Sequence, residues 1–526
     1  MSDAPDRGIT VTEIAPMGEP IDVSPETSVA FIGRTLRGPL NTPVAVGSFA
    51  DFRKRFGDSW SRSSLGPAVE QFFEHGGKRL CIVRVANNAR GAMIRLPAAG
   101  SALALRAVEP GSSEHIRASV DYDGIDGDAS FNLTLQRIDP TTGLVSDQEM
   151  YRRLSHREQD ERFVVDTLLN SRMVRVEHPY PAHRPDVTPA GNTGYGVGYV
   201  DPVQAGTDGN ELTDYDLIGS RVDGTGLFAL ERLEQALERL DLIYMPPPGK
   251  GRDIGPAAIL AAELFCRTRH TMLVVDPPSS WHTAADVVAG LRRSGFQSEN
   301  LITYFPRLRL RLRGSADRSP RAAGGALIGL LCKNDRRHGR WRDLNDETPG
   351  FKRRLRPAID LDDADSRRLV GFGVNVVRVG AAGMARLSGS VTLGYGNSMD
   401  TDAARLAARR LCLGIVAGVD RATRWAIFER LDEHLVQGLK AQLKAYLAGL
   451  AERGAFADGG FDIRCEVRPT PGEVNAANEV KLLLTFRPVG CGKPMSVTLH
   501  QSISGCRVSR TAFAPARGTA PDEASA

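Results

Sequence analysis

Short apolar runs separated by turn residues mark the first part of the chain. Val29–Gly33 is one such run, and Gly38-Pro39 behind it marks a turn. Gly76-Gly77 ends a predicted helix, and Leu80–Val85 is rich in the β-branched residues that favour a strand. Residues 23–91 are therefore predicted to form a compact α/β unit.

The pattern changes to alternation between apolar and polar positions in residues 92–218. Two runs show it, with their apolar members at Ile116, Ala118 and Val120, and at Phe131, Leu133 and Leu135. Gly, Asp and Pro separate such runs, and residues 178–214 are rich in Pro, Gly and Asn, which favours irregular structure. This section is predicted to be a mostly β insertion.

Helical periodicity returns at Gly226 and alternates with short apolar runs. Helices are predicted at 226–240, 257–267 and 284–292, and strands at 242–245, 271–275, 301–305 and 374–379. Strand and helix in alternation predict a parallel sheet covered by helices.

The last third of the chain combines two long helices with alternating strands. The helices are predicted at 403–419 and 435–450, and the strands at 461–468, 480–486 and 496–503, of which the first two are predicted to pair antiparallel. An apolar stripe runs along the second helix from Leu435 to Leu450, while Lys440 and Lys444 lie off that stripe.

The two ends of the chain carry strand patterns without a clear local partner. Ile9 and Val11 alternate with threonines, and Pro16 and Pro20 exclude a helix there. An unpaired strand exposes backbone N–H and C=O groups, and pairing with another chain satisfies them. The alternative is that both segments are edge strands of the same monomer. The final residues, TAFAPARGTAPDEASA, lack large apolar side chains and are predicted to be disordered.

The predicted fold class is α/β, α+β overall, with a mostly β inserted domain and extended strand arms at both ends. Six sections are expected: an N-terminal arm (1–22), the first part of the core (23–91), the β insertion (92–218), the second part of the core (219–380), a helical and β domain (381–490), and a C-terminal arm and tail (491–526).

Composition places the chain among ordinary globular proteins. Its 526 residues predict two to four domains, and 41% apolar and 25% charged residues are typical values. Seven cysteines without close pairs predict reduced thiols in the cytosol. We find no signal-peptide pattern and no apolar run of about 20 residues that would cross a bilayer.

Candidate enzyme motifs are present but incomplete. Gly224, Gly226 and Ala229 fit a G-x-G-x-x-A pattern, but a polar stretch precedes them where a dinucleotide site needs a strand. Asp276 follows a predicted parallel strand, where α/β enzymes place catalytic groups, with His282 nearby. An α/β enzyme resting on Asp276 is therefore one alternative, and a plain strand-ending turn is the other.

Phosphate-loop and metal motifs are also incomplete. Gly490–Lys493 resembles half of a phosphate loop, but Pro494 replaces the Ser or Thr that binds magnesium. His178 and His183 have no cysteine or carboxylate partners at ligand spacing, so no zinc site is predicted. We expect no cofactor, no metal and no catalytic residue.

Basic residues concentrate between Arg307 and Arg356. This stretch holds fifteen Arg or Lys and five Asp or Glu, a net charge of +10, whereas the whole chain carries only +4. Such a surface could bind nucleic acid, but few aromatic residues accompany it. An interface with an acidic neighbour and a solvated surface are the other interpretations.

An ordered series of segments resembles the contractile tail sheath family of phages, R-type bacteriocins and related injection particles. The series covers about 400 residues, and its members are TSVAFIGRTLRGPLNTP (27–43), FADFRKRFG (49–57), FFEHGGKRLCIVRV (72–85), FVVDTLLNSRMVRV (163–176), TGLFALERLEQALERLDLIYMPPP (225–248), ALIGLLCKNDRRHGRW (326–341) and GFGVNVVRV (371–379).

The resemblance implies a structural subunit without enzymatic activity. Such subunits form stacked rings around an inner tube and contract to drive the tube through a target envelope. Implied partners are identical subunits, the inner tube protein, and baseplate and tail-terminator proteins, with no nucleic acid and no membrane insertion. Assembly would take place in the bacterial cytoplasm, before incorporation into a phage tail or contractile particle.

The resemblance also assigns residues. Terminal arms link subunits in this family, which implies inter-subunit strands around Ile9, Val11, Ile14, Val497, Leu499 and Ile503. The helix over 435–450 would face the tube through Lys440 and Lys444, and a solvated helix face is the alternative.

Overall fold

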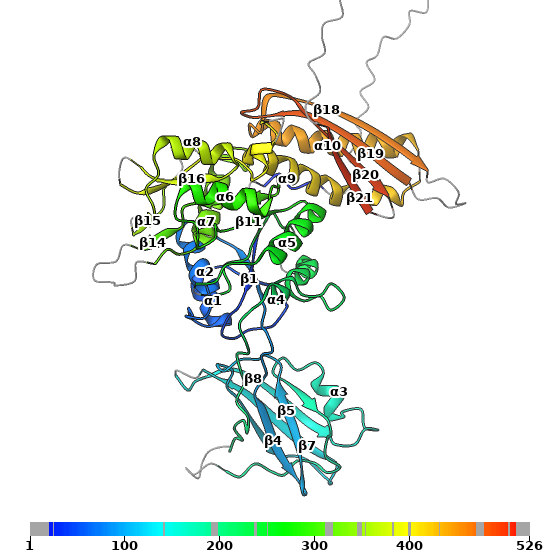
Figure 1. Ribbon diagram of the computed structural model, residues 1–526. Helices are drawn as coiled ribbons and strands as arrows, with labels where there is room; N and C mark the ends of the chain where they lie inside the picture. The colour runs from blue at the N-terminus through cyan, green and yellow to red at the C-terminus, as the bar shows by residue number, and fades with distance from the viewer. Residues whose placement is uncertain are drawn as a thin grey trace, which may run out of the picture.

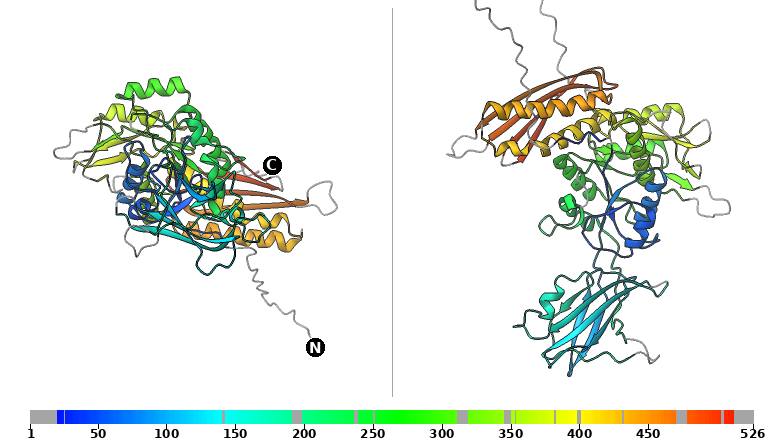
Figure 2. Two further views of the ribbon diagram at one scale, coloured as in Figure 1. Left: turned by 90° about the horizontal axis from the view of Figure 1, so that it is seen from below. Right: turned by 180° about the vertical axis from the view of Figure 1, so that it is seen from behind.

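The computed structural model describes residues 20–511 except for residues 25, 140–141, 191–197, 236–238, 250, 311–318, 345–349, 353, 381–382, 398–400, 431, 470–477 and 503–504. Figure 1 shows three parts in a row: a β-rich outer unit, a central α/β core and a C-terminal unit. The right-hand view of Figure 2 shows the outer unit and the C-terminal unit at opposite ends of the core.

A six-stranded sheet forms the centre of the core. Its order is β12-β11-β10-β1-β3-β2, and the strands are β1 (Val29–Gly33), β2 (Val44–Val46), β3 (Leu80–Arg84), β10 (Leu242–Tyr244), β11 (Met272–Val274) and β12 (Leu301–Ile302). All neighbours run parallel except β2, which pairs antiparallel with β3. Because β1 pairs directly with β10, the long insertion between β3 and β10 leaves the sheet continuous.

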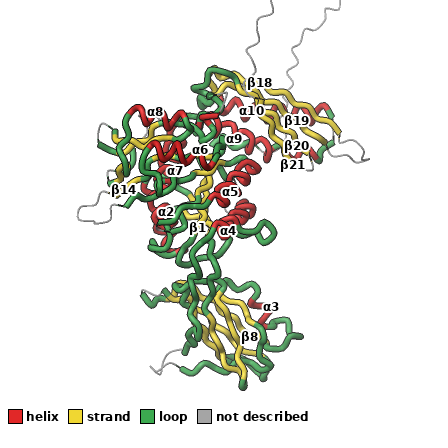
Figure 3. The backbone as a smooth tube through the Cα atoms, in the orientation of Figure 1, coloured by secondary structure: helices red, strands yellow, loops and turns green. Residues whose placement is uncertain are grey.

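Helices cover both faces of this sheet, as Figure 3 shows. One face packs against α1 (Phe49–Phe56), α2 (Leu65–Glu74) and α7 (Gly324–His338), and the other against α4 (Asp214–Ile218), the 3-10 helix η1 (Gly226–Gln235), α5 (Pro256–Arg269) and α6 (Ala284–Ser294). Helix α7 lies so close to α2 that a Cβ on Gly325 would meet the Ala68 carbonyl oxygen at 2.2 Å. Two-sided burial explains why the strands are apolar throughout.

Two small sheets extend the core beside α8 (Asp363–Gly371). One contains β13 (Tyr304–Phe305), β16 (Asn375–Val379) and β17 (Ala385–Ser388), and the other β14 (Leu308–Leu310) and β15 (Leu355–Pro357). The single strand predicted over 301–305 is therefore wrong in one respect. The chain leaves the central sheet after Ile302 and joins β16 at Tyr304.

The outer unit consists of two three-stranded antiparallel sheets around a core of its own. Their strands are β4 (Met93–Ala98), β5 (Ser101–Ala107) and β9 (Val174–Glu177), and β6 (Ile116–Asp121), β7 (Ser130–Ile138) and β8 (Val145–Ser155), with the short helix α3 (Val164–Leu168) beside them. The six alternating residues singled out in β6 and β7 are all buried in this core, as predicted.

The C-terminal unit packs helices on one face of a four-stranded antiparallel sheet. The helices are α9 (Leu406–Ala422), α10 (Glu433–Glu452) and the 3-10 helix η3 (Arg424–Ile427), with a further 3-10 turn, η2 (Tyr395–Asn397), ahead of them. The sheet order is β18-β19-β20-β21, with β18 (Phe456–Pro469), β19 (Asn478–Pro488), β20 (Met495–Ser502) and β21 (Gly505–Thr511).

The mixed α/β architecture with a β insertion confirms the predicted fold class. One predicted helix differs in type: the segment from Gly226 is a 3-10 helix, entered through a tight turn in which Gly226 has a φ of +59°. None of the described helices is long and apolar enough to cross a membrane.

Candidate assembly site

Asp276 has a structural role, because its carboxylate binds groups of neighbouring elements. Its Oδ1 accepts hydrogen bonds from the backbone N–H groups of Ala323 (2.9 Å) and Gly324 (3.0 Å) at the start of α7, and its Oδ2 accepts one from the Tyr244 hydroxyl at 2.5 Å. Burial, together with this carboxylate, raises the pKa of Tyr244 well above its usual value, so the phenol stays a donor. Asp276 thus caps α7 and joins it to β10 and β11.

The residues of the other candidate enzyme motifs also lie in turns or at a helix cap. Gly224 and Gly226 follow α4 and a turn, without the preceding strand that a dinucleotide site requires. Gly490 lies in the turn between β19 and β20 with a φ of +81°. The His282 N–H donates to Asp286, whose carboxylate belongs to the capping box of α6. Within the described ranges, no group of three or more His, Cys, Asp or Glu could hold a metal ion, and His178 and His183 belong to none.

Part of the basic stretch 307–356 is used inside the molecule. Ion pairs join Arg307 to Asp253, Arg340 to Asp241 and Arg354 to Glu74, and Arg336 donates to the Gly76 carbonyl oxygen. These four side chains therefore bind neighbouring elements of the same chain. Arg311 and Arg313 lie outside the described residues.

The first described residues, 20–24 and 26–28, form a segment that we call the arm root because the predicted N-terminal arm continues from it. Ile21 and Val23 pack against the apolar core of the C-terminal unit. A Cβ on Gly418 of α9 would lie 3.1 Å from Ile21, so the small residue allows this close contact. Ile9, Val11 and Ile14, the predicted inter-subunit residues of the arm, lie outside the described residues.

Three arginines hold the arm root: Arg340 and Arg410 are buried, and Arg239, which donates to the Glu26 carbonyl oxygen, is half-buried. Arg340 donates to the Ser24 carbonyl oxygen at 2.8 Å and pairs with Asp241 at 3.0 Å, and Arg239 pairs with the same carboxylate at 3.1 Å. Arg410, from α9, donates to the Thr27 hydroxyl at 3.0 Å.

Two carboxylates balance these arginines, the fully buried Asp335 and the mostly buried Asp241. Asp335 is fully buried and binds Arg410, with one contact at 2.9 Å. Burial by itself would raise the pKa of Asp241, but the guanidinium groups of Arg239 and Arg340 and the Ser28 N–H outweigh it, so its pKa is lower than usual. The arm root is thereby tied to the core and to the C-terminal unit at once.

The C-terminal strand prediction needs a correction. Val497 and Leu499, predicted to lie in an unpaired arm, belong to β20, which pairs with β19 on one side and with β21 on the other. Both side chains are fully buried. The physical reason is that the chain forms a further strand, β21, which pairs with the second edge of β20. Ile503 lies outside the described residues.

Strand β18 presents the longer outer edge of this sheet. Among the described strands it pairs only with β19, so its other edge carries backbone groups without a strand partner. Its apolar residues, Phe461, Ile463, Cys465 and Val467, are half-buried and alternate with exposed charged residues. A 14-residue edge strand of this kind can pair with a further strand.

Helix α10 has the two faces that the sequence predicted. Leu435, Leu439, Leu443 and Leu447 are buried against the sheet, whereas Lys440 and Lys444 are exposed. The two lysines lie one turn apart on the same exposed face.

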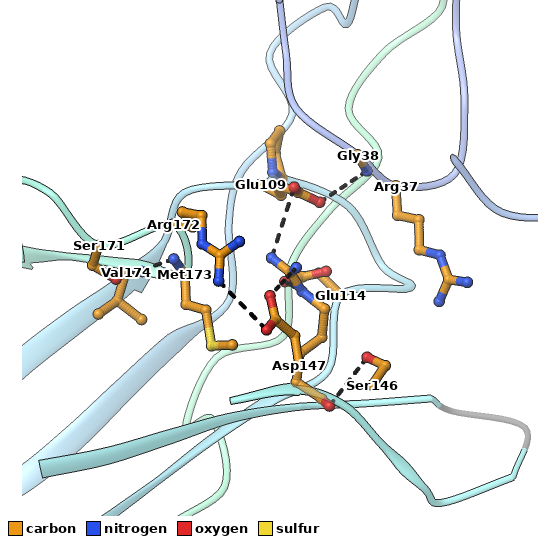
Figure 4. A network of polar contacts seen from close by, with 12 residues as sticks. Arg37, Gly38, Glu109, Glu114, Ser146, Asp147, Ser171, Arg172, Met173 and Val174 are labelled. Carbon is orange, nitrogen blue, oxygen red and sulfur yellow. Dashed lines mark hydrogen bonds and ion pairs between the residues drawn. The ribbon is translucent and has the colours of Figure 1, made fainter. Parts of the chain in front are cut away.

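A polar network forms a neck between the core and the outer unit, and Figure 4 shows most of it. The Gly38 N–H of the core donates to Glu109 of the outer unit at 2.9 Å. Arg137 donates to Glu114 at 2.8 Å and lies 3.7 Å from Glu109. Burial raises the pKa of Glu114 despite the nearby arginine.

Arg84 completes the neck from the end of β3. Its guanidinium is 2% exposed and donates to the carbonyl oxygens of Gly38 at 2.5 Å and Pro110 at 2.6 Å. Burial lowers the pKa of Arg84 to about 10, which leaves it charged at neutral pH. One side chain therefore binds both units. No sequence pattern indicated this role, because an arginine at a strand end is usually solvent-exposed.

Comparison with known proteins gives matches at the level of structure. No protein-family model matches the sequence, and no curated protein matches it. The sheath tail protein of Listeria innocua has a similar structure, with a TM-score of 0.61 and 15% identity over 91% of this chain and 96% of that chain. The sheath tail protein of Desulfitobacterium hafniense gives a TM-score of 0.53 and 14% identity over 94% of this chain and 100% of that chain. These matches confirm the fold that the resemblance implied.

Proposed function

We propose that this chain is a structural subunit of a contractile tail sheath, which polymerises around an inner tube and contracts to drive the tube through a target envelope. The observation that supports this most is the match to the Listeria sheath tail protein over 91% of this chain and 96% of that one. A match of this extent includes the core, the β insertion and the C-terminal unit together.

The alternative functions have less support from the side chains. An enzyme resting on Asp276 would need a carboxylate available to a substrate, but both oxygens of this group bind α7 and Tyr244. A nucleic-acid site on residues 307–356 would need solvent-facing cations, but Arg307 and Arg340 are mostly buried in ion pairs.

Subunits would be linked by strand exchange at the C-terminal sheet. Residues 8–14 of one copy carry the alternating strand pattern, and β18 on another copy, a strand of 14 residues, offers an outer edge that pairs with no described strand. Pairing would satisfy the backbone groups of both. The arm root, fixed by Arg239, Arg340 and Arg410, would then attach the exchanged strand to the body of its own subunit.

Contraction would move the globular units as rigid bodies while the arms keep them joined. Helix α10 would face the inner tube, and the exposed Lys440 and Lys444 would make weak, salt-sensitive contacts with it. Baseplate and tail-terminator proteins would bind the ends of the polymer. The subunit would be made in the bacterial cytoplasm and become part of a phage tail or contractile particle.

Electron microscopy of the purified chain tests this function. We expect negatively stained samples to show rings or striated tubes. A chain that stays a small oligomer at all concentrations and salt conditions would argue against a sheath.

Deletion of residues 1–19 tests the arm exchange separately. The arm root remains in this variant, so we expect a folded chain with an unchanged circular dichroism spectrum that no longer forms tubes. Normal tubes from the truncated chain would exclude exchange through the N-terminal arm, even if the sheath function itself holds.

A further inference from the structure

A polar groove of about 410 Å³ lies where the core meets the C-terminal unit. It is lined by the segment behind α7, the start of α9, the end of α10 and the turn between β19 and β20. The residues that matter for its chemistry are Trp341, Arg342, Asp343, Arg405, Arg453 and Gly490.

The groove carries an excess of positive charge. Three arginines, Arg342, Arg405 and Arg453, line the groove with one carboxylate, Asp343, so these four groups carry a net charge of +2. Arg405 already pairs with Asp343 and donates to the Gly490 carbonyl oxygen. Arg342 and Arg453 are exposed, so their charge is available to a bound anion.

Two buried polar atoms at the groove lack a partner in the described part of the chain. Trp341 is 3% exposed, and no described residue accepts a hydrogen bond from its Nε1. Likewise, no described group donates to Asp343 Oδ1. Both atoms belong to residues that line the groove but are themselves buried in its wall, so they make the wall polar without being open to a ligand. The exposed Arg342 and Arg453 favour a peptide segment with acidic side chains, because a carboxylate and a guanidinium form charge-assisted hydrogen bonds.

The chain itself contains such a segment, and the described residues that follow it lie next to the groove. Arg453, which lines the groove, donates to the Val23 carbonyl oxygen of the arm root at 3.0 Å, and Trp341 also lines a small cavity formed by residues 22–24. Glu19 is four residues from Val23, a reach of at most about 14 Å in extended chain. Residues 1–19 contain Asp3, Asp6, Glu13 and Glu19 against one arginine, Arg7, a net charge of −3.

We propose that this groove binds the acidic N-terminal segment of the same chain, with the carboxylate of Glu19, and of Glu13 behind it, on Arg342 and Arg453. The groove is then an intrachain latch that holds the segment in the unassembled subunit. Opening the latch breaks exposed ion pairs, which salt weakens. The latch does not depend on the proposed sheath function, because it needs only the isolated chain.

Hydrogen–deuterium exchange on the dilute full-length chain tests the latch. We expect the amides of residues 14–19 to exchange about fivefold faster or more in Arg342→Glu than in the unmodified chain, the scale of one exposed ion pair. Glu13→Gln with Glu19→Gln should give the same increase, and Arg342→Glu combined with Glu19→Arg should restore slow exchange. Arg293→Glu, an exposed charge reversal on α6, is the matched control and should change nothing.

Three results would overturn the latch. Equal exchange rates in the unmodified chain and in Arg342→Glu would show that the groove does not hold the segment. Protection that increases with protein concentration would assign the groove to a second copy. A third result is faster exchange of the groove-lining residues in Asp346→Asn with Glu347→Gln, while the Glu19 variants exchange like the unmodified chain. This result would assign the groove to the adjacent acidic residues.

Discussion

At the scale of single residues, buried arginines form ion pairs and hydrogen bonds that join distant parts of the chain. Arg410 is 7% exposed and Asp335 is fully buried, so this ion pair has little contact with water. Removal of one partner from such a pair leaves an uncompensated buried charge, which costs far more than the pair itself contributes.

A substitution at Arg410 tests this balance. We expect Arg410→Met to lower the free energy of unfolding by about 3–5 kcal/mol, because the Asp335 carboxyl group would stay buried without its ion-pair partner. Arg410→Met with Asp335→Leu should recover a large part of that loss, since both charges are then absent. Urea denaturation followed by tryptophan fluorescence measures the effect.

The exposed Arg430 provides the matched control for this pair. Arg430→Met should change the free energy of unfolding by less than about 0.5 kcal/mol. A similar loss in both single variants would show that the buried pair has no special role.

The lowered pKa of Asp241 predicts that the stability of the chain depends on pH. Its pKa in the folded chain lies below the usual Asp value of about 3.9, so its ionised form stabilises the fold. This contribution is complete above about pH 5 and is lost as the pH falls through the lowered pKa of the folded state. The stability difference between the unmodified chain and Asp241→Asn should therefore shrink from pH 5 to pH 3, measured by thermal unfolding. A constant difference over that range would contradict this assignment.

Individual elements show where periodicity is a reliable guide. The alternating residues of β6 and β7 and the apolar stripe of α10 lie where the sequence predicted, because one face of each element must leave water. Strand β20 was also predicted as a strand, but its neighbour β21 was not, since Cys506 and Val508 make a short and weak alternation. Pairing between strands depends on the whole sheet, so it was not visible in the strand pattern itself.

Helix α10 is proposed to contact the inner tube, and charge reversal on its exposed face tests this. We expect Lys440→Glu with Lys444→Glu to weaken co-sedimentation with the tube protein of the same particle, and to weaken its dependence on salt, because the exposed positive charges are reversed. Lys493→Glu, an exposed charge reversal on the turn before β20, is the control. Unchanged co-sedimentation in the double variant would remove α10 from the tube contact.

The three units of the molecule are joined by specific polar contacts. The arm root joins the core to the C-terminal unit, and the neck around Arg84 and Arg137 joins the core to the outer unit. A neck with buried charged groups favours one orientation, because any other would leave these groups without partners. The outer unit is therefore expected to move together with the core.

A substitution at Arg84 tests whether the neck is a rigid joint. We expect Arg84→Met to make the connections at residues 85–92 and 204–212 at least several-fold more sensitive to limited proteolysis, since the Gly38 and Pro110 carbonyl oxygens lose their donor. The outer unit and the core should survive as intact fragments. Arg95→Met, on an exposed position of β4, should leave the cleavage rate unchanged, and equal rates in both variants would argue against the neck as a rigid joint.

The sequence by itself determined the α/β class, the β insertion, the two-faced helix α10 and the resemblance to sheath proteins. These follow from local patterns, because the period of apolar residues records which face of an element is buried. Only the tertiary structure decided that Asp276 caps a helix, that β20 lies inside a sheet and that Arg84, Arg340 and Arg410 are buried. Each of these depends on groups far apart in the chain, such as Arg410 and Thr27, whose proximity no local pattern records.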